Sequence, residues 1–163
     1  MINRTLITNI KASFTRPADT TAYTAGDLVA NSTTAGAVVP LTFTRSPTIG
    51  NLFIRRLRFY KSGTSITNAS FRLHLFRAAP TFTAGDNATA AGSGILNHIG
   101  AFDVTMTGAL SDGSFGVGLP VTGTEIGVEG GGLPALYGAV QAMAAYTPAS
   151  AEVFTAVLEA HRY

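Results

Sequence analysis

Two neighbouring runs decide the fold class: Leu52-Phe53-Ile54-Arg55-Arg56-Leu57-Arg58-Phe59-Tyr60-Lys61 and Ser70-Phe71-Arg72-Leu73-His74-Leu75-Phe76-Arg77. Successive side chains of a β-strand point to opposite faces, so each run can be divided by parity. One face of the first run then holds Phe53, Leu57 and Phe59, and one face of the second holds Phe71, Leu73 and Leu75. Such alternation is typical of an antiparallel sheet covered on one side. We therefore expect two strands whose apolar faces meet in one interior.

The linker between these runs, residues 62–67, is short and contains Gly63. A connection of this kind favours a β-hairpin, in which the two strands pair directly. The polar positions Arg56, Arg58 and Arg72 would then share one outer sheet face.

The composition points to a covered surface rather than to a membrane or a nucleic acid. Of the 163 residues 46% are hydrophobic and only 12% are charged, about half the usual charged fraction of a soluble domain. Surfaces so poor in charge are typical of proteins that contact other subunits or a lattice. No apolar run approaches the roughly 20 residues of a spanning helix, and a net charge of +2 is too small to indicate nucleic acid binding. We therefore expect neither a membrane nor a nucleic acid as a partner.

Eighteen glycines and the absence of cysteine favour short strands joined by turns, without disulfides or thiolate metal sites. We predict an all-β protein, an antiparallel β-sandwich of jelly-roll-like type. Residues 1–15 are expected to form an N-terminal arm or edge strand, and residues 16–163 a single sandwich domain. Further strands are expected at 12–16, 35–43, 95–106, 136–143 and 153–162, with a tight hairpin turn at 111–114.

No catalytic constellation is visible in the sequence. The three histidines, His74, His98 and His161, are far apart and lack a second ligand at metal spacing. Most acidic residues fall in turns, where they serve as hydrogen-bonding turn residues, and Gly-x-Ser-x-Gly does not occur. We predict no enzymatic activity, no cofactor and no metal site.

Basic residues cluster in the two central runs. The candidate partner-binding residues are Arg55, Arg56, Arg58, Arg72 and Arg77. Three interpretations stay open: a solvated outer face, docking on an acidic protein surface through bidentate carboxylate contacts, and, third, nucleic acid binding, which the inward-facing aromatic residues disfavour.

Several blocks carry a resemblance to a known family: Arg16-Pro17-Ala18-Asp19-Thr20-Thr21-Ala22-Tyr23-Thr24-Ala25-Gly26-Asp27, Ser70 to Pro80, Ala84 to Ala88, and more loosely Tyr146 to Ala151. In these blocks the chain resembles a family of small virion proteins from tailed bacteriophages. The resemblance implies a capsid decoration, or cement, protein that bridges neighbouring major capsid subunits on the head surface after assembly in the host cytoplasm. It also implies self-association as a dimer or trimer.

Two other classes stay open. A carbohydrate- or host-binding module of a phage fibre would need exposed aromatic residues in a groove, for which Tyr23, Tyr60, Tyr137 and Tyr146 are the candidates. Another head-tail structural component is a further alternative. An enzyme, most simply a hydrolase, ranks last because no acid, base and nucleophile set is present.

Overall fold

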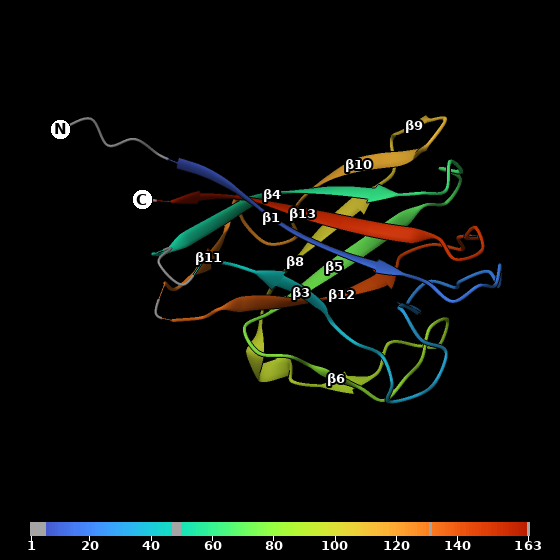
Figure 1. Cartoon of the computed structure of the whole chain (residues 1–163), viewed down its shortest axis with the longest axis horizontal. Coiled ribbons are helices and arrows are strands. Elements are labelled where there is room, and N and C mark those ends of the chain that lie inside the picture. Colours follow the sequence, from blue (N-terminus) through green and yellow to red (C-terminus); the bar gives the residue numbers. More distant parts are fainter. Residues whose placement is uncertain (1–5, 47–49, 131, 163) are drawn as a thin grey trace.

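The structure is a computed structural model that describes residues 6–46, 50–130 and 132–162. Nearly all of its regular structure is β-strand (Figure 1). Within the described residues the helical segment is one 3-10 turn, η1 (Ile95–Asn97), and no helix is long and apolar enough to cross a membrane. The strands are β1 (Leu6–Thr15), β2 (Leu28–Val29), β3 (Leu41–Thr44), β4 (Leu52–Lys61), β5 (Ser70–Phe76), β6 (Thr81–Phe82), β7 (Gly92–Ser93), β8 (His98–Thr105), β9 (Gly108–Leu110), β10 (Gly113–Pro120), β11 (Ile126–Val128), β12 (Ala135–Ala142) and β13 (Val153–Arg162).

The long strands form two antiparallel layers. The first layer has the order β1-β13-β4-β10, and the second has the order β8-β5-β12 with β3 and β2 beside β12. The first and last long strands of the chain, β1 and β13, pair along their whole length (blue and red in Figure 1). With β4 beside β13, and with β3, β12, β5 and β8 side by side in the other layer, this is the strand order of a jelly roll. The predicted fold class is confirmed.

The two layers are joined at a corner made by β10. Its first part, up to Gly118, pairs with β4, and its last residues, Leu119 and Pro120, pair with β8. At the corner β10 crosses so close to β8 that a Cβ at Gly116 would lie 2.4 Å from the carbonyl oxygen of Thr105. Only glycine allows this approach. At the other edge of the sandwich, β1 contacts β3.

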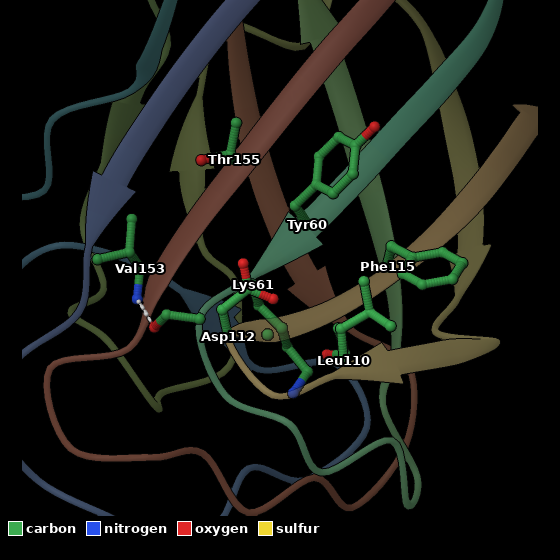
Figure 2. Close-up of a pocket in the computed structure, with 10 residues that line it drawn as sticks. Tyr60, Lys61, Leu110, Asp112, Phe115, Val153 and Thr155 are labelled. Carbon is green, nitrogen blue, oxygen red and sulfur yellow. Dashed lines mark hydrogen bonds between the residues drawn. The ribbon is translucent and has the colours of Figure 1, made fainter.

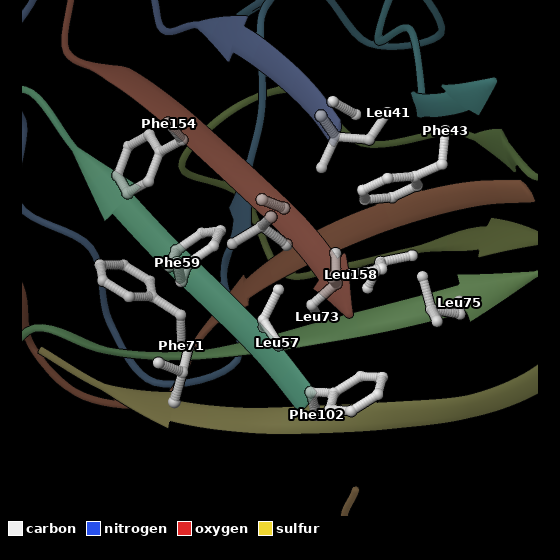
Figure 3. Close-up of a cluster of buried hydrophobic side chains, with 14 of the residues drawn as sticks. Leu41, Phe43, Leu57, Phe59, Phe71, Leu73, Leu75, Phe102, Phe154 and Leu158 are labelled. Atoms are coloured by element: carbon white, nitrogen blue, oxygen red, sulfur yellow. The ribbon is translucent and has the colours of Figure 1, made fainter. Parts of the chain in front are cut away.

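The core lies between the layers and is rich in aromatic rings (Figure 3). Phe59 of β4 and Phe71 of β5 face each other with ring centroids 5.7 Å apart. The ring of Phe154 lies 5.7 Å from Phe59 and 5.4 Å from Phe71. Such pairs stabilise a core beyond the area that they bury. The predicted meeting of two apolar strand faces in one interior is therefore confirmed.

The prediction that β4 and β5 form a hairpin is wrong, because the two strands lie in opposite layers. Residues 62–69 cross the end of the sandwich instead of making a tight turn. As a consequence Arg56 and Arg58 lie on the outer face of the first layer and Arg72 on that of the second. The expectation that these three arginines share one face is therefore wrong as well.

The predicted inward position of Phe53 is also wrong. The pairing of β13 with β4 shifts register between Glu159 and Ala160, so Arg55 is an extra residue in a β-bulge. Parity changes at the bulge: Leu52 and Ile54 point inward before it, and Leu57 and Phe59 point inward after it. Phe53 falls on the half-buried side.

Two strand boundaries differ from expectation. The segment predicted as a strand over 35–43 is regular only in β3, and Val39 before it is 64% exposed, because Pro40 limits pairing there. The first strand begins at Leu6 rather than near residue 12. The strands predicted at 95–106, 136–143 and 153–162 correspond to β8, β12 and β13, and the hairpin at 111–114 joins β9 to β10.

The segment after β5 covers part of the second layer from outside. β6 and β7 pair with each other (β6 lies below β12 in Figure 1). A small second apolar cluster lies between this cover and the sheet, formed by Leu28, Ala30, Phe76, Phe82 and Ala139. This explains why Phe76 breaks the polar alternation of its strand: it points outward, yet is covered.

Candidate docking surface

The five predicted partner-binding arginines are not gathered at one place, and four of them already have partners within the chain. Arg55 pairs with Glu125 at 3.1 Å, and Arg56 with Glu159 at 2.6 Å. The Nη2 of Arg58 donates to Asn9 at 2.8 Å.

On the other layer, Arg72 donates two hydrogen bonds of 2.6 and 2.7 Å to the carboxylate of Asp103. This bidentate contact raises the pKa of Arg72 and lowers the pKa of Asp103, in each case chiefly through the hydrogen bonds between them. Arg77 follows β5 and is exposed. Arg55, Arg56 and Arg72 therefore neutralise neighbouring carboxylates on two opposite faces, and the five arginines do not form one basic patch.

One exposed surface of the first layer is apolar and belongs to β10. Alternate residues of this strand, Phe115, Val117 and Leu119, are 40%, 52% and 65% exposed, and we call them the β10 row. The outer face of an antiparallel sheet that meets water is normally polar. The β10 row is therefore a candidate contact surface.

The alternation along β10 is visible in the sequence, but parity would place the large residues of the β10 row on the wrong face of the sheet. In Gly113–Pro120 large residues alternate with Gly and Ser, a pattern that predicts large residues inward. The structure has the reverse, because the inward positions Gly116 and Gly118 lie at the crowded corner of the sandwich. The apolar side chains are left outside.

At the end of the row lies a hollow of about 400 Å³ between β4, β10 and the turn after β9 (Figure 2). Tyr60 and Phe115 are paired residues on adjacent strands and line it together with Leu110, which is 68% exposed. Polar groups of Ser62, Asp112 and Thr155 complete its lining. The Oγ of Ser62 accepts a hydrogen bond of 2.9 Å from the amide of Val153. The hollow thus combines exposed aromatic surface with a few polar groups.

Most of the tyrosines proposed for a sugar-binding groove are buried or packed against other residues. Tyr23 and Tyr146 are each 1% exposed, and Tyr137 packs against the second apolar cluster. Of the four candidates, Tyr60 is the one that reaches a hollow of the described surface, and its aromatic neighbour there, Phe115, was not among the candidates.

Two buried ionic networks were missed at the sequence level. Asp86 accepts hydrogen bonds from Arg16 (2.8 Å), from the hydroxyl of Tyr23 (2.7 Å) and from the amide of Ala30 (2.7 Å). These contacts join the loop before β2 to the loop after β6. Nothing in the local sequence marks Asp86 as different from other turn aspartates, because its partners are remote in the chain.

The second network holds Lys61, which belongs to the basic run but points inward. Its Nζ donates to the carbonyl oxygens of Gly63 (2.9 Å) and Ser65 (2.6 Å) and to Glu152 (3.2 Å). The hydroxyl of Tyr146 lies 2.7 Å from both oxygens of Glu152. Burial lowers the pKa of Lys61 against the opposing effect of Glu152. Both networks hold loops in place, and Lys61 also lies at the wall of the hollow beside Tyr60.

Two histidines that are 24 positions apart meet on the outer face of the second layer. The Nδ1 of His74 lies 3.3 Å from the Nε2 of His98, while the Nε2 of His74 lies 3.2 Å from the Oε1 of Gln141. Burial lowers the pKa of both imidazoles. The third histidine, His161, is on β13 in the other layer. No group of three or more His, Cys, Asp or Glu residues lies within reach of one metal ion in the described residues.

Comparison with known proteins gives distant structural similarities. No family model and no curated protein matches the chain. Among solved structures, it is similar to a chain of the virus-like particle of extra small virus from the giant freshwater prawn Macrobrachium rosenbergii, with 11% identity and a TM-score of 0.30 over 99% of this chain and 80% of that one. A chain from a marine algae virus of the order Picornavirales is similar at 13% identity and a TM-score of 0.24, over 95% of this chain and 68% of that one. The jelly-roll assignment rests on the strand pairing itself.

Proposed function

We propose that this protein is a structural virion protein that decorates a tailed-bacteriophage head and stabilises it by bridging major capsid subunits. The phage assignment comes from the sequence resemblance. The proposed mode of action rests on the β10 row, an exposed apolar strip on a strand that is paired with β4. Repeated over a shell, many modest contacts of this kind give strong retention without a single tight site.

The structure changes which residues we assign to the contact. The arginines Arg55, Arg56, Arg58 and Arg72 are held by carboxylate or amide groups of the same chain, so they do not offer free charges to a partner. We assign the docking core to the β10 row with Leu110 and Tyr60, and the arginines to a polar rim. Interfaces typically have this organisation, with an apolar centre and a charged edge.

The test is binding of the purified chain to expanded heads of the phage that encodes it, followed by co-sedimentation and cryo-electron microscopy. Wild type should appear as ordered density on the head surface. The double variant Phe115→Asp, Val117→Asp should lose occupancy, because it places two charges in the apolar centre. Val39→Asp is the control, since it adds a charge away from β10 at a valine that is 64% exposed, compared with 52% for Val117.

The two ways of failing are separable. Heads that carry no density for wild type would overturn the decoration role. Density that persists with the double variant would leave that role standing and overturn the assignment of the β10 row.

A second candidate function is a carbohydrate- or host-binding module, which the hollow beside Tyr60 and Phe115 favours. Aromatic faces beside hydroxyl and carboxylate groups are the usual lining of small-ligand sites. A glycan array with wild type and Tyr60→Ala tests it: binding that is lost in Tyr60→Ala supports this function, and an array without hits removes it.

A further inference from the structure

We propose that His74 and His98 form a binding site for a divalent transition metal of the Zn²⁺ type, with water completing the coordination. The inference is independent of the virion role. It rests on where the two ring nitrogens point and on what holds them there.

The orientation of His74 is fixed by a chain of hydrogen bonds. The Nε2 of Gln141 donates to the carbonyl oxygen of Gly26 at 3.1 Å, so the amide oxygen of Gln141 is directed at His74. That oxygen can only accept, and the Nε2 of His74 must therefore carry the proton. The lone pair of His74 is then on Nδ1, the atom that faces His98. Metal-ligating histidines usually have such an outer hydrogen-bond partner.

An irregularity in the pairing of β5 with β8 places His98 on the same outer face as His74. Phe102 and Val104 of β8 point into the core, so plain alternation would turn His98 inward too. The pairing of β5 with β8 shifts register between Leu75 and Phe76, which leaves Ile99 as an extra residue. Ile99 packs against the core instead, and His98 is paired with Phe76 on the outer face. Bulges often re-aim a side chain beside a functional site.

Gly100 makes this bulge possible. Its φ of +151° is rarely adopted by residues with a side chain, and a Cβ there would lie 2.6 Å from the Cδ1 of Ile126. A glycine therefore stands at the position where β8 departs from regular pairing and places His98 on the outer face.

The distance between the two nitrogens suits a metal ion. Two imidazole nitrogens on a tetrahedral zinc, each about 2.0–2.1 Å from the ion, lie about 3.3–3.4 Å apart. The observed separation of the Nδ1 of His74 and the Nε2 of His98 is 3.3 Å. A small adjustment of either ring would aim both lone pairs at a shared ion.

The surroundings leave room for the remaining ligands. His74, His98 and Gln141 line a hollow of about 330 Å³ under the cover formed by residues 80–95. Waters would complete the coordination there, in place of the third and fourth protein ligands that zinc sites usually have. The nearby cation Arg72 is neutralised by its two bonds to Asp103, so it does not strongly repel a metal.

The experiment is titration of ZnCl₂ into the full chain, followed by calorimetry and by imidazole nitrogen NMR. We expect one binding event, with shifts at His74 and His98. His74→Ala and His98→Ala should abolish it, and Gln141→Leu should weaken it by about tenfold or more, the usual effect of losing such an outer partner. His161→Ala, which removes a histidine in the other layer, should bind as wild type.

Three results would overturn the site: no heat and no imidazole shifts at millimolar zinc, binding that survives His98→Ala, or shifts confined to His161. Circular dichroism of each variant shows whether it is folded. If His98→Ala is not folded, Gln141→Leu decides, because unchanged zinc affinity in that variant contradicts the proposed orientation of His74.

Discussion

At the scale of single residues, the sandwich depends on buried charged groups that are paired with one another, above all Lys61 and Glu152. The side chains of Lys61 and Glu152 are both 0% exposed, and the lysine has three acceptors. Removing one member of a buried pair leaves the other charge without compensation, which costs far more than the pair itself contributes.

Glu152→Gln should therefore destabilise the protein by at least about 3 kcal/mol, because the ammonium group of Lys61 stays buried without its counter-charge. Urea unfolding measures the change. Glu125→Gln is the control: it breaks the partly exposed pair with Arg55 and should cost less than about 1 kcal/mol. Equal effects of the two variants would contradict the role given to burial.

The two buried tyrosines predict an alkaline transition. Burial, followed by hydrogen bonding to Asp86 or Glu152, raises the pKa of Tyr23 and of Tyr146 far above the ordinary value of 10.0. Because the folded-state pKa is raised, the stability from these hydroxyls is complete below about pH 10 and is lost as the pH rises further.

In a titration followed at 295 nm, ionisation of these two tyrosines should coincide with loss of the circular dichroism signal. Tyr146→Phe should reduce the amplitude of that late step. Ionisation of both tyrosines in protein that is still folded would contradict the prediction.

At the scale of elements, parity in the sequence predicts strand faces well until a bulge or a corner intervenes. Five of the six side chains expected in the core, Leu57, Phe59, Phe71, Leu73 and Leu75, are there, each no more than 1% exposed. Phe53 is the exception because the bulge at Arg55 depends on the partner strand β13, which follows about 100 residues later. The candidate site was harder to predict, since ion pairing of the arginines is set by remote carboxylates.

The close approach of β10 to β8 predicts that the stability of the protein depends on glycine at position 116. Gly116→Ala should destabilise the protein by about 1–3 kcal/mol, because its Cβ would meet the carbonyl oxygen of Thr105 at 2.4 Å. Thermal unfolding reports the change. Gly50→Ala is the control, since nothing lies within 4 Å of a Cβ there. A Gly116→Ala variant as stable as wild type would show that β10 can move away from β8.

At the scale of the whole molecule, the charged groups beside the β10 row are held within the chain, whereas the row itself stays exposed. Arg55, Arg56 and Arg72 pair with carboxylates of the same chain on opposite faces of the sandwich. Phe115, Val117 and Leu119 form an exposed apolar row on β10, with Arg58 beside Val117 on the paired strand β4. A partner that meets the β10 row gains by removing apolar area from water, a contribution that salt does not screen. A partner that meets the arginines would first have to compete with Glu125, Glu159 and Asp103.

Binding to phage heads should therefore depend weakly on ionic strength. Raising NaCl from about 0.1 M to about 0.5 M shortens the screening length about twofold, yet the affinity should stay within about threefold. Arg56→Gln should have a similarly small effect, while Val117→Asp should weaken binding at both salt concentrations. Retention on heads measured by sedimentation provides the comparison. A steep fall in retention with salt, matched by loss of binding in Arg56→Gln, would return the docking role to the arginines and take it from the β10 row.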